Sequence, residues 1–331
     1  MLRVVAQARL LRAAILISAC GFACALAVSP ASAARQAVIA SLSPNDAFYS
    51  ELAWPATSIQ LPQAWALTTG SPSVTIAILD TGVTPVPDLR GALVPGYNFV
   101  ADNTDTLDDN GHGTEVASIA AARIDNHIGI AGVCGRCSIM PVKVLDANGN
   151  GSPETIAEGV TWAAAHGANI INLSVYSNED SPVLDAAIAA ATAQGVTVVI
   201  AAGNSGSSNP AAGGYPAAAS PSAIRVAGLN AHNNLFGWSN RGSSVDIAAP
   251  GAASAAMDQG TFFLGLQGTS VAAPVVAGVA GLMLSENSSL TPADVKSLID
   301  STGTPLPGLD VSSGRRINAY AALLGSLSQQ S

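Results

Sequence analysis

Charged and aromatic residues are scarce in this sequence. Lys, Arg, Asp and Glu make up 11% of the 331 residues and aromatic residues only 5%, whereas 49% are hydrophobic. So apolar a chain argues against disorder, and its net charge of −9 disfavours nucleic-acid binding. The 32 Gly and abundant Ala favour close packing of helices on a sheet, in a chain long enough for one large domain.

A hydrophobic run long enough for a membrane span is also missing from the N-terminal region. The run over residues 13–28 holds about 16 residues, against roughly 20 for a span. Three Arg precede it and Ala31-Ser32-Ala33 follows, the pattern of a signal peptide over residues 1–33. We therefore expect a secreted protein, extracellular or periplasmic, with no membrane contact after cleavage. A retained membrane anchor and a lipid anchor at Cys20 are the alternatives.

Only four cysteines occur, and two of them, Cys20 and Cys24, leave with the expected signal peptide. The remaining pair is Cys134 and Cys137. In an exported chain this pair predicts a small disulfide loop. Free thiols are the next alternative. A redox or zinc site is disfavoured, because no further pair of zinc ligands is visible nearby.

Short, branched apolar segments alternate with helical ones after residue 42. The expected strands cover residues 74–79, 139–145, 170–175, 196–201, 224–229 and 245–247. Helical patterns such as 155–166 and 182–194 lie between several of them. This order predicts a doubly wound α/β fold with a mainly parallel sheet and helices on both faces. Chemistry is then expected at the carboxyl ends of the strands.

Three short segments supply a carboxylate, an imidazole and a hydroxyl in that order along the chain. They are Asp80-Thr81-Gly82, His112-Gly113-Thr114 and Gly268-Thr269-Ser270. A hydroxyl is a poor nucleophile near neutral pH, so acyl transfer needs a base beside it and a third group to orient that base. Each residue alone has a plain structural reading, such as a helix N-cap for Ser270. Together they predict a catalytic triad.

The Asp, His, Ser order is that of subtilisin. The chain resembles the subtilisin-like serine proteases, the subtilase or S8 peptidase family, and within it the thermitase-like group. The strongest matching segments are Ala77-Ile78-Leu79-Asp80-Thr81-Gly82-Val83, Asn110-Gly111-His112-Gly113-Thr114, Ala201-Ala202-Gly203-Asn204-Ser205-Gly206 and Gly268-Thr269-Ser270 with Pro274. The resemblance implies a catalytic domain over residues 44–327.

The resemblance implies a secreted serine endopeptidase that needs no cofactor for catalysis and acts as a monomer on polypeptides. Ser270 would be the nucleophile, His112 the general base and Asp80 its orienting partner. Asn204 would donate to the oxyanion, together with the Ser270 backbone N–H. The residues expected to bind substrate are Ser174, Val175, Tyr176, Ala202 and Gly203.

Some residues depart from the family pattern. Glu115 replaces a usual His, Ser118 a usual Gly, and Tyr176 a usual Gly in the substrate-binding strand. These changes keep open a second hypothesis, a catalytically impaired protein that only binds peptides. A non-peptidase acyl hydrolase is a third, which the absence of a Gly-x-Ser-x-Gly segment disfavours.

Two further features follow from the resemblance. Residues 34–43 form a short N-terminal segment without a recognisable folding prodomain. Structural calcium is possible, since it binds carboxylate, amide and carbonyl oxygens. The ligands implied are Asp46, Asn126 and backbone oxygens near Arg123, Ile128 and Ile130, with Asn98 at the family's second carboxylate position.

Overall fold

The computed structural model describes residues 41–50, 53–175, 181–208, 223–256 and 262–330. The expected signal peptide, with Cys20 and Cys24, lies outside the described residues, and so does Tyr176. Residues Ala40–Ser331 form one compact unit.

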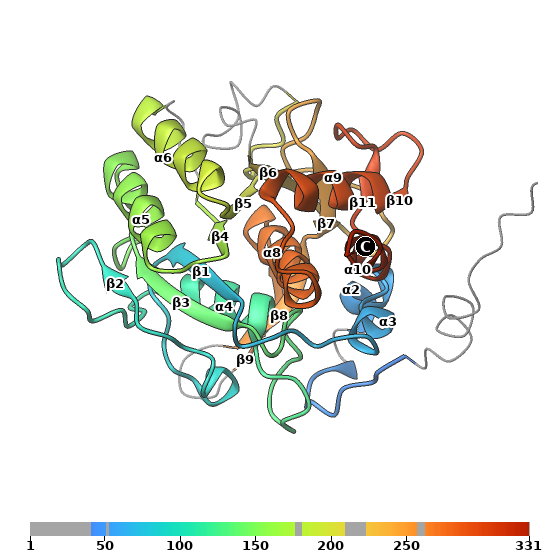
Figure 1. The fold of residues 1–331 in the computed structure, drawn as a ribbon, viewed down its shortest axis with the longest axis horizontal. Coiled ribbons are helices and arrows are strands. Elements are labelled where there is room, and N and C mark those ends of the chain that lie inside the picture. The colour runs from blue at the N-terminus through green and yellow to red at the C-terminus, as the bar shows by residue number, and fades with distance from the viewer. Residues whose placement is uncertain (1–40, 51–52, 176–180, 209–222, 257–261, 331) are drawn as a thin grey trace, which may run out of the picture. The chain divides into compact units, whose positions relative to one another are not determined.

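A nine-stranded sheet forms the centre of this unit (Figure 1). Its order is β10-β11-β7-β6-β5-β4-β1-β3-β2, and neighbouring strands are parallel except for the antiparallel pair β10 and β11. The strands are β1 Thr75–Asp80, β2 Tyr97–Asn98, β3 Ser138–Lys143, β4 Ile170–Leu173, β5 Thr197–Ala201, β6 Ile224–Leu229, β7 Ile247–Pro250, β10 Thr304–Pro305 and β11 Arg315–Arg316. The predicted doubly wound parallel sheet is confirmed, although the last expected strand begins two residues later.

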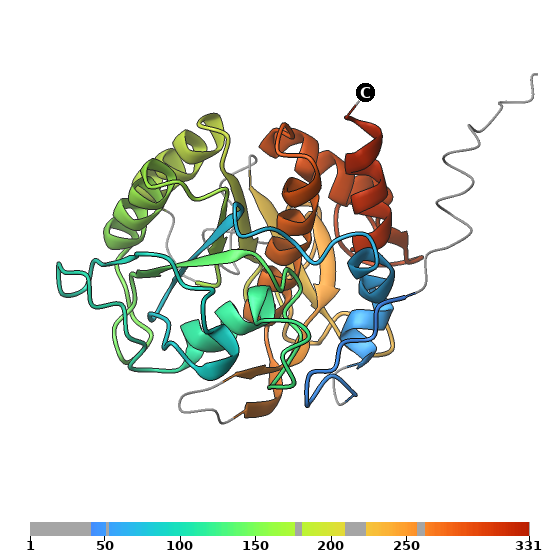
Figure 2. The same ribbon diagram turned by 60° about the horizontal axis from the view of Figure 1, so that its bottom comes forward.

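Helices cover both faces of the sheet (Figures 1 and 2). α5 and α6 pack together over one face, whereas α4 and α8 pack together over the other. The helices are α2 Ala53–Ser58, α3 Leu61–Trp65, the 3-10 helix η2 Pro87–Leu89, α4 His112–Ala121, α5 Pro153–Ala165, α6 Pro182–Ala193, α8 Thr269–Glu286, α9 Pro292–Thr302 and α10 Ala319–Ser328. Local sequence explains several starts: Ser152 and Ser181 cap α5 and α6, each followed by Pro.

Alternate side chains of β1 enter two different cores. Ile76 and Ile78 pack with α4 and α8, whereas Ala77 and Leu79 pack with α5 and α6. Burial on both faces explains why the four residues between Thr75 and Asp80 are all apolar.

An antiparallel hairpin of β8 Ala252–Ala256 and β9 Phe262–Gln267 lies outside the main sheet. It was not expected from the sequence. β9 leads directly into α8, so this hairpin sets the start of the longest described helix. α8 is also the one described helix long and apolar enough to cross a membrane, but 83% of it is buried inside the protein. It is therefore a core helix.

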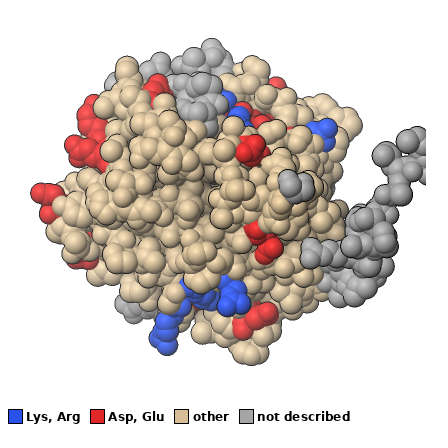
Figure 3. Space-filling view, viewed as in Figure 1, with Lys and Arg blue, Asp and Glu red and all other residues tan. Residues whose placement is uncertain are grey.

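Few of the charges lie in the interior, and much of the face in Figure 3 is uncharged. One buried group of charges joins β6, β7 and α9. Asp246 accepts hydrogen bonds from Arg225 at 2.9 Å through Oδ2 and at 3.1 Å through Oδ1, and Lys296 Nζ lies 2.6 Å from Oδ1. These bonds lower the pKa of Asp246 despite its burial. The group ties the sheet to α9.

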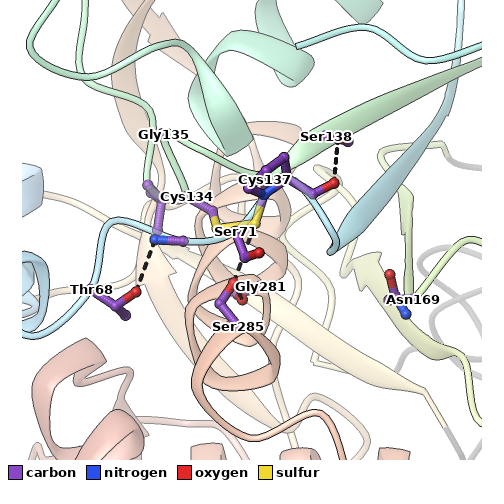
Figure 4. The surroundings of a disulfide bond; sticks show 12 residues. Thr68, Ser71, Cys134, Gly135, Cys137, Ser138, Asn169, Gly281 and Ser285 are labelled. Carbon is purple, nitrogen blue, oxygen red and sulfur yellow. Dashed lines mark hydrogen bonds between the residues drawn. A yellow bond between two sulfur atoms is a disulfide. The ribbon is translucent and has the colours of Figure 1, made fainter.

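Cys134 and Cys137 form a disulfide with both residues fully buried. The bond lies against α8 at Gly281 (Figure 4), where an added Cβ would come within 3.1 Å of both sulfurs. On the other side, a Cβ at Gly70 would come within 2.3 Å of the Cys134 sulfur. Two positions without side chains therefore make room for the disulfide.

Candidate functional site

Asp80 and His112 meet where the carboxyl end of β1 lies beside the start of α4. Asp80 is the last residue of β1 and is fully buried, and His112 is the first residue of α4. His112 Nδ1 lies 2.7 Å from Asp80 Oδ1, which also accepts a 2.8 Å bond from the Thr81 N–H. With Nδ1 engaged by the carboxylate, Nε2 is the ring nitrogen left to accept a proton.

Ser270 is the second residue of α8, and its backbone is fixed from β4. Pro274 lacks an N–H, so the Ser270 carbonyl has no i+4 donor within the helix. The Ser174 hydroxyl donates to this carbonyl at 3.1 Å and accepts from Asn172 Nδ2 at 2.9 Å. The Ser270 hydroxyl in turn lies 3.4 Å from the Ser174 carbonyl oxygen. The candidate nucleophile is thus hydrogen-bonded, through its backbone carbonyl, to Ser174 of the expected substrate-binding segment.

Asn204 follows β5 and is oriented by the start of α8. Its Oδ1 accepts bonds of 2.9 Å from both the backbone N–H and the hydroxyl of Thr269. The same Thr269 hydroxyl accepts from the Gly203 N–H at 3.1 Å. Because Thr269 holds Oδ1, the side-chain amide nitrogen of Asn204 faces away from Thr269. Gly203 has a φ of 97°, which favours glycine at this turn.

One cleft brings these groups together. Its lining includes His112, Asn204 and Ser270, and also Ser174 and Val175. Apolar side chains from neighbouring elements continue the cleft, namely Leu145, Ile156 and Leu184. Ala202 and Gly203, also expected to bind substrate, are buried beneath Asn204. A separate apolar pocket beside α3 contains none of these groups.

Negative charges around His112 stabilise its protonated form. Asp80 has the largest effect, followed by Glu115 and Asp108, and together they raise the pKa of His112 to about 9. Glu115 is only 8% exposed, so it does not point into solvent, and burial raises its own pKa. The replacement of the usual His at this position therefore adds an acidic group close to the imidazole.

The residues expected to bind calcium are partly brought together. Asp46 is buried, and its Oδ1 has no hydrogen-bond partner among the residues that the structure describes. Asn126 donates to Asp88 Oδ1 at 2.8 Å, and the Ile130 N–H donates to Asp88 Oδ2 at 2.9 Å. Burial, reinforced by the charge of Asp46, raises the pKa of Asp88 to about 6. Two buried carboxylates and an amide are a donor set that suits calcium.

Asn98, expected at the second carboxylate position, makes its hydrogen bonds within its own loop. Its Oδ1 accepts from the N–H groups of Val100 and Ala101, and its Nδ2 donates to the Asp105 carbonyl at 2.7 Å. Asn98 thus closes its own turn, whereas the carboxylate beside Asn126 is that of Asp88. The Arg123 side chain donates to the backbone carbonyls of Gly135 and Cys137, beside the disulfide.

Sequence reasoning missed four polar residues around the site, namely Asp88, Asp108, Lys143 and Asn172. Asp88 belongs to the segment Pro87-Asp88-Leu89, which does not show that its carboxylate meets Asn126. Asp108 lies four residues before His112, where an acid can cap the helix that follows. Lys143 and Asn172 carried no signal, because a lone polar residue in an apolar strand does not reveal its partner.

Comparisons with known proteins agree with this geometry. A model of the subtilase family, peptidase family S8, matches residues 71–315. Thermitase of Thermoactinomyces vulgaris is 40% identical over 282 residues, covering 85% of this chain and 99% of thermitase. Subtilisin Savinase of Lederbergia lenta is 37% identical over 269 residues, covering 81% of this chain and 97% of Savinase.

A solved protease of Pseudoalteromonas arctica has a similar fold. The TM-score is 0.78 at 29% sequence identity, and the match covers 86% of this chain and 100% of the other. The chain belongs to the subtilase family and is a serine endopeptidase.

Proposed function

We propose that this chain is a secreted endopeptidase that hydrolyses peptide bonds with Asp80, His112 and Ser270 as its catalytic triad. The observation that carries the proposal is the 2.7 Å contact between Asp80 and His112 at one end of a cleft that Ser270 also lines. Family membership supports the reaction class. An extended substrate would pair with the backbone at Ser174 and Val175, where main-chain bonds give affinity.

In this mechanism His112 Nε2 takes the proton of Ser270 as its oxygen attacks the peptide carbonyl. Asp80 holds the imidazole by Nδ1 and stabilises the imidazolium that forms. The oxyanion then receives hydrogen bonds from the amide nitrogen of Asn204 and from the Ser270 N–H at the start of α8. His112 returns the proton to the leaving amine, and a water repeats the sequence to release the acyl group.

A fluorophosphonate probe tests the assignment directly. The purified protein should gain one adduct, and peptide mapping should place it on Ser270, because only an assembled triad activates a serine hydroxyl. The labelled and unlabelled proteins are then compared on a denatured protein substrate, which separates a peptidase from an esterase. A folded sample that takes no label would contradict the proposal and favour a protein that only binds peptides.

The pH dependence offers a second test through Glu115. His112 must be neutral to act as a base, so kcat/KM is expected to rise with pH up to about 9, the pKa that its acidic neighbours produce. Glu115→Gln removes one of the charges that stabilise the imidazolium. The pKa of His112 then falls and the acid limb moves to lower pH. The measurement is kcat/KM against pH for a chromogenic peptide.

The matched control for this charge change is Glu158→Gln, an exposed position on α5. Its acid limb should coincide with that of the unchanged protein, since screened surface charges have little effect at a distance. If Glu115→Gln leaves the limb in place as well, Glu115 does not influence the base.

We further propose a structural calcium ion held by Asp46, Asp88 and Asn126. The orphaned Oδ1 of Asp46 and the raised pKa of Asp88 support it, because a cation would compensate two carboxylates that are buried together. The ion would hold the N-terminal segment to the loop of residues 123–130. It takes no part in the peptide hydrolysis described above.

Calcium should stabilise the protein against heat, and chelation should remove that gain. A hundredfold excess over Kd corresponds to about 3 kcal/mol. Asp88 becomes protonated as pH falls through about 6, so the gain should shrink below that pH. Asp88→Asn should abolish the calcium response, whereas Asn98→Ala should retain it. Melting temperatures with and without calcium decide the matter, and a full response in Asp88→Asn would refute the site.

Secretion, monomeric state and domain limits belong to the same proposal. The pattern of residues 1–33 supports export, and the pairing of Cys134 with Cys137 fits an oxidising compartment. The catalytic domain would then extend over residues 44–327, after a short segment at 34–43.

A further inference from the structure

Asp108 accepts five hydrogen bonds around the base of the catalytic helix. Its Oδ1 accepts from the Thr81 hydroxyl at 2.8 Å and from the N–H groups of Asn110 and Gly111 at 3.0 and 2.8 Å. Its Oδ2 accepts from the N–H and the hydroxyl of Thr114 at 2.9 and 2.6 Å. These bonds lower the pKa of Asp108 although desolvation opposes them, so the group is a carboxylate at neutral pH.

These partners lie on both sides of the Asp80 to His112 contact. Thr81 directly follows Asp80, whereas Gly111 and Thr114 flank His112 at the start of α4. The Thr81 hydroxyl also accepts from the Gly113 N–H at 2.9 Å. The end of β1 and the first turn of α4 are therefore joined twice, once through Asp108 and once through Thr81.

The helix start shows why an outside carboxylate is needed. Gly111 is the N-cap residue of α4 and has a φ of 109°, so it has no side chain with which to cap the helix. The N–H groups of the first turn otherwise have no acceptor within the helix. Asp108 supplies that acceptor from the preceding loop, and its negative charge suits the N-terminal end of the helix dipole.

A buried lysine on β3 holds the backbone of Thr81. Lys143 Nζ donates to the Thr81 carbonyl at 2.6 Å and to the Leu145 carbonyl at 2.9 Å, and it pairs with Asp109 at 2.6 Å. Thr81 is thus held by its carbonyl from β3 and by its hydroxyl from Asp108. The residue next to Asp80 has little freedom to move.

We propose that Asp108 is a positioning residue that sets the geometry of the Asp80 to His112 contact. The inference rests on the proposed triad and adds to it a residue that touches neither substrate nor the reacting atoms. A carboxylate is required because it accepts at two oxygens and has no hydrogens of its own. An asparagine would turn an NH2 group toward donors on one side or the other.

The test is Asp108→Asn, which changes one atom of the side chain and removes its charge. We expect kcat to fall by about 10- to 100-fold, the loss that follows when a catalytic group is displaced by about 1 Å, with little change in KM. The proton NMR signal of His112 Nδ1–H should broaden or shift, because the hydrogen bond to Asp80 loses its fixed geometry. Both quantities are measured at a temperature where circular dichroism shows a folded protein.

Asp105→Asn is the matched control. Asp105 lies in the same loop and is exposed, and its carboxylate accepts a bond from the Leu107 N–H. It should retain both kcat and the His112 signal. Thr81→Val removes the hydroxyl without a change of charge and should also lower kcat. Because both changes break the same link, the double variant should lose less than the product of the two single losses.

The outcomes separate this inference from the proposed function. Suppose that the unchanged protein is active and that Asp108→Asn and Thr81→Val both keep its kcat and its His112 signal. This result would overturn the positioning role, even if both variants melt at a lower temperature. Absence of hydrolysis in the unchanged protein would instead contradict the proposed function. In that case the NMR signal of His112 Nδ1–H is compared between Ser270→Ala and the double variant that also carries Asp108→Asn. This comparison still decides whether Asp108 sets the geometry of the Asp80 to His112 contact.

Discussion

Ser270→Ala is expected to abolish peptide hydrolysis, with kcat lower by about 10⁶, the loss measured for the corresponding change in subtilisin. Two other hydroxyls line the cleft, but both are engaged: that of Ser174 with the Ser270 carbonyl, and that of Thr81 with Asp108. The Ser270 hydroxyl contributes little to the fold, since it lies 3.4 Å from the Ser174 carbonyl oxygen. The variant should therefore fold and melt like the unchanged protein. Steady-state hydrolysis of a chromogenic peptide and a thermal melt measure the two effects.

A serine on the same helix provides the control. Ser285 lies near the other end of α8 and donates to the Gly281 carbonyl at 2.7 Å. Ser285→Ala should keep full activity and remain labelled by the fluorophosphonate probe. Turnover that persists in Ser270→Ala at more than trace levels would place the nucleophile elsewhere.

Asp80→Asn is expected to lower kcat by about 10⁴, the size of the loss when a triad aspartate becomes asparagine in a serine protease. The amide would donate to His112 Nδ1, and the proton of the neutral ring would then lie on Nε2. A ring in that tautomer cannot accept the proton of Ser270. KM should change little, since Asp80 is buried and does not line the cleft.

Asp294→Asn is a suitable comparison because Asp294 is a carboxylate held by Thr291 at the start of α9, and it does not line the cleft. It should leave kcat unchanged. Nitrogen NMR of His112 distinguishes the tautomers directly, and an Asp80→Asn protein whose ring still carries its proton on Nδ1 would contradict this account.

The fold was largely predictable because periodicity and apolar composition report burial. Six strands and the main helices follow from runs such as Val74 to Leu79, which is apolar apart from Thr75 because both faces of the sheet are covered. The hairpin of β8 and β9 was not predictable, since Gly and Ser interrupt its pattern.

The candidate site was predictable only where residues lie in motifs. Asp80, His112, Asn204 and Ser270 belong to such segments, and their catalytic roles remain predictions until tested. The contact between Asp88 and Asn126 was not predictable, because spacing along the chain does not reveal which loops meet. Asp108 was missed because its five partners come from two separate segments, and only the folded chain brings them to one carboxylate.

The disulfide against α8 has a consequence for how sequences of this kind vary. Cys134 and Cys137 fit only because Gly70 and Gly281 have no side chains where the sulfurs lie. A Cβ at Gly70 would overlap the Cys134 sulfur, and one at Gly281 would press on both sulfurs. Loss of the cysteines would leave a space that larger residues could fill. These four positions are therefore expected to change together among relatives. An alignment rich in relatives should show them covarying as a unit, separately from the residues of the cleft.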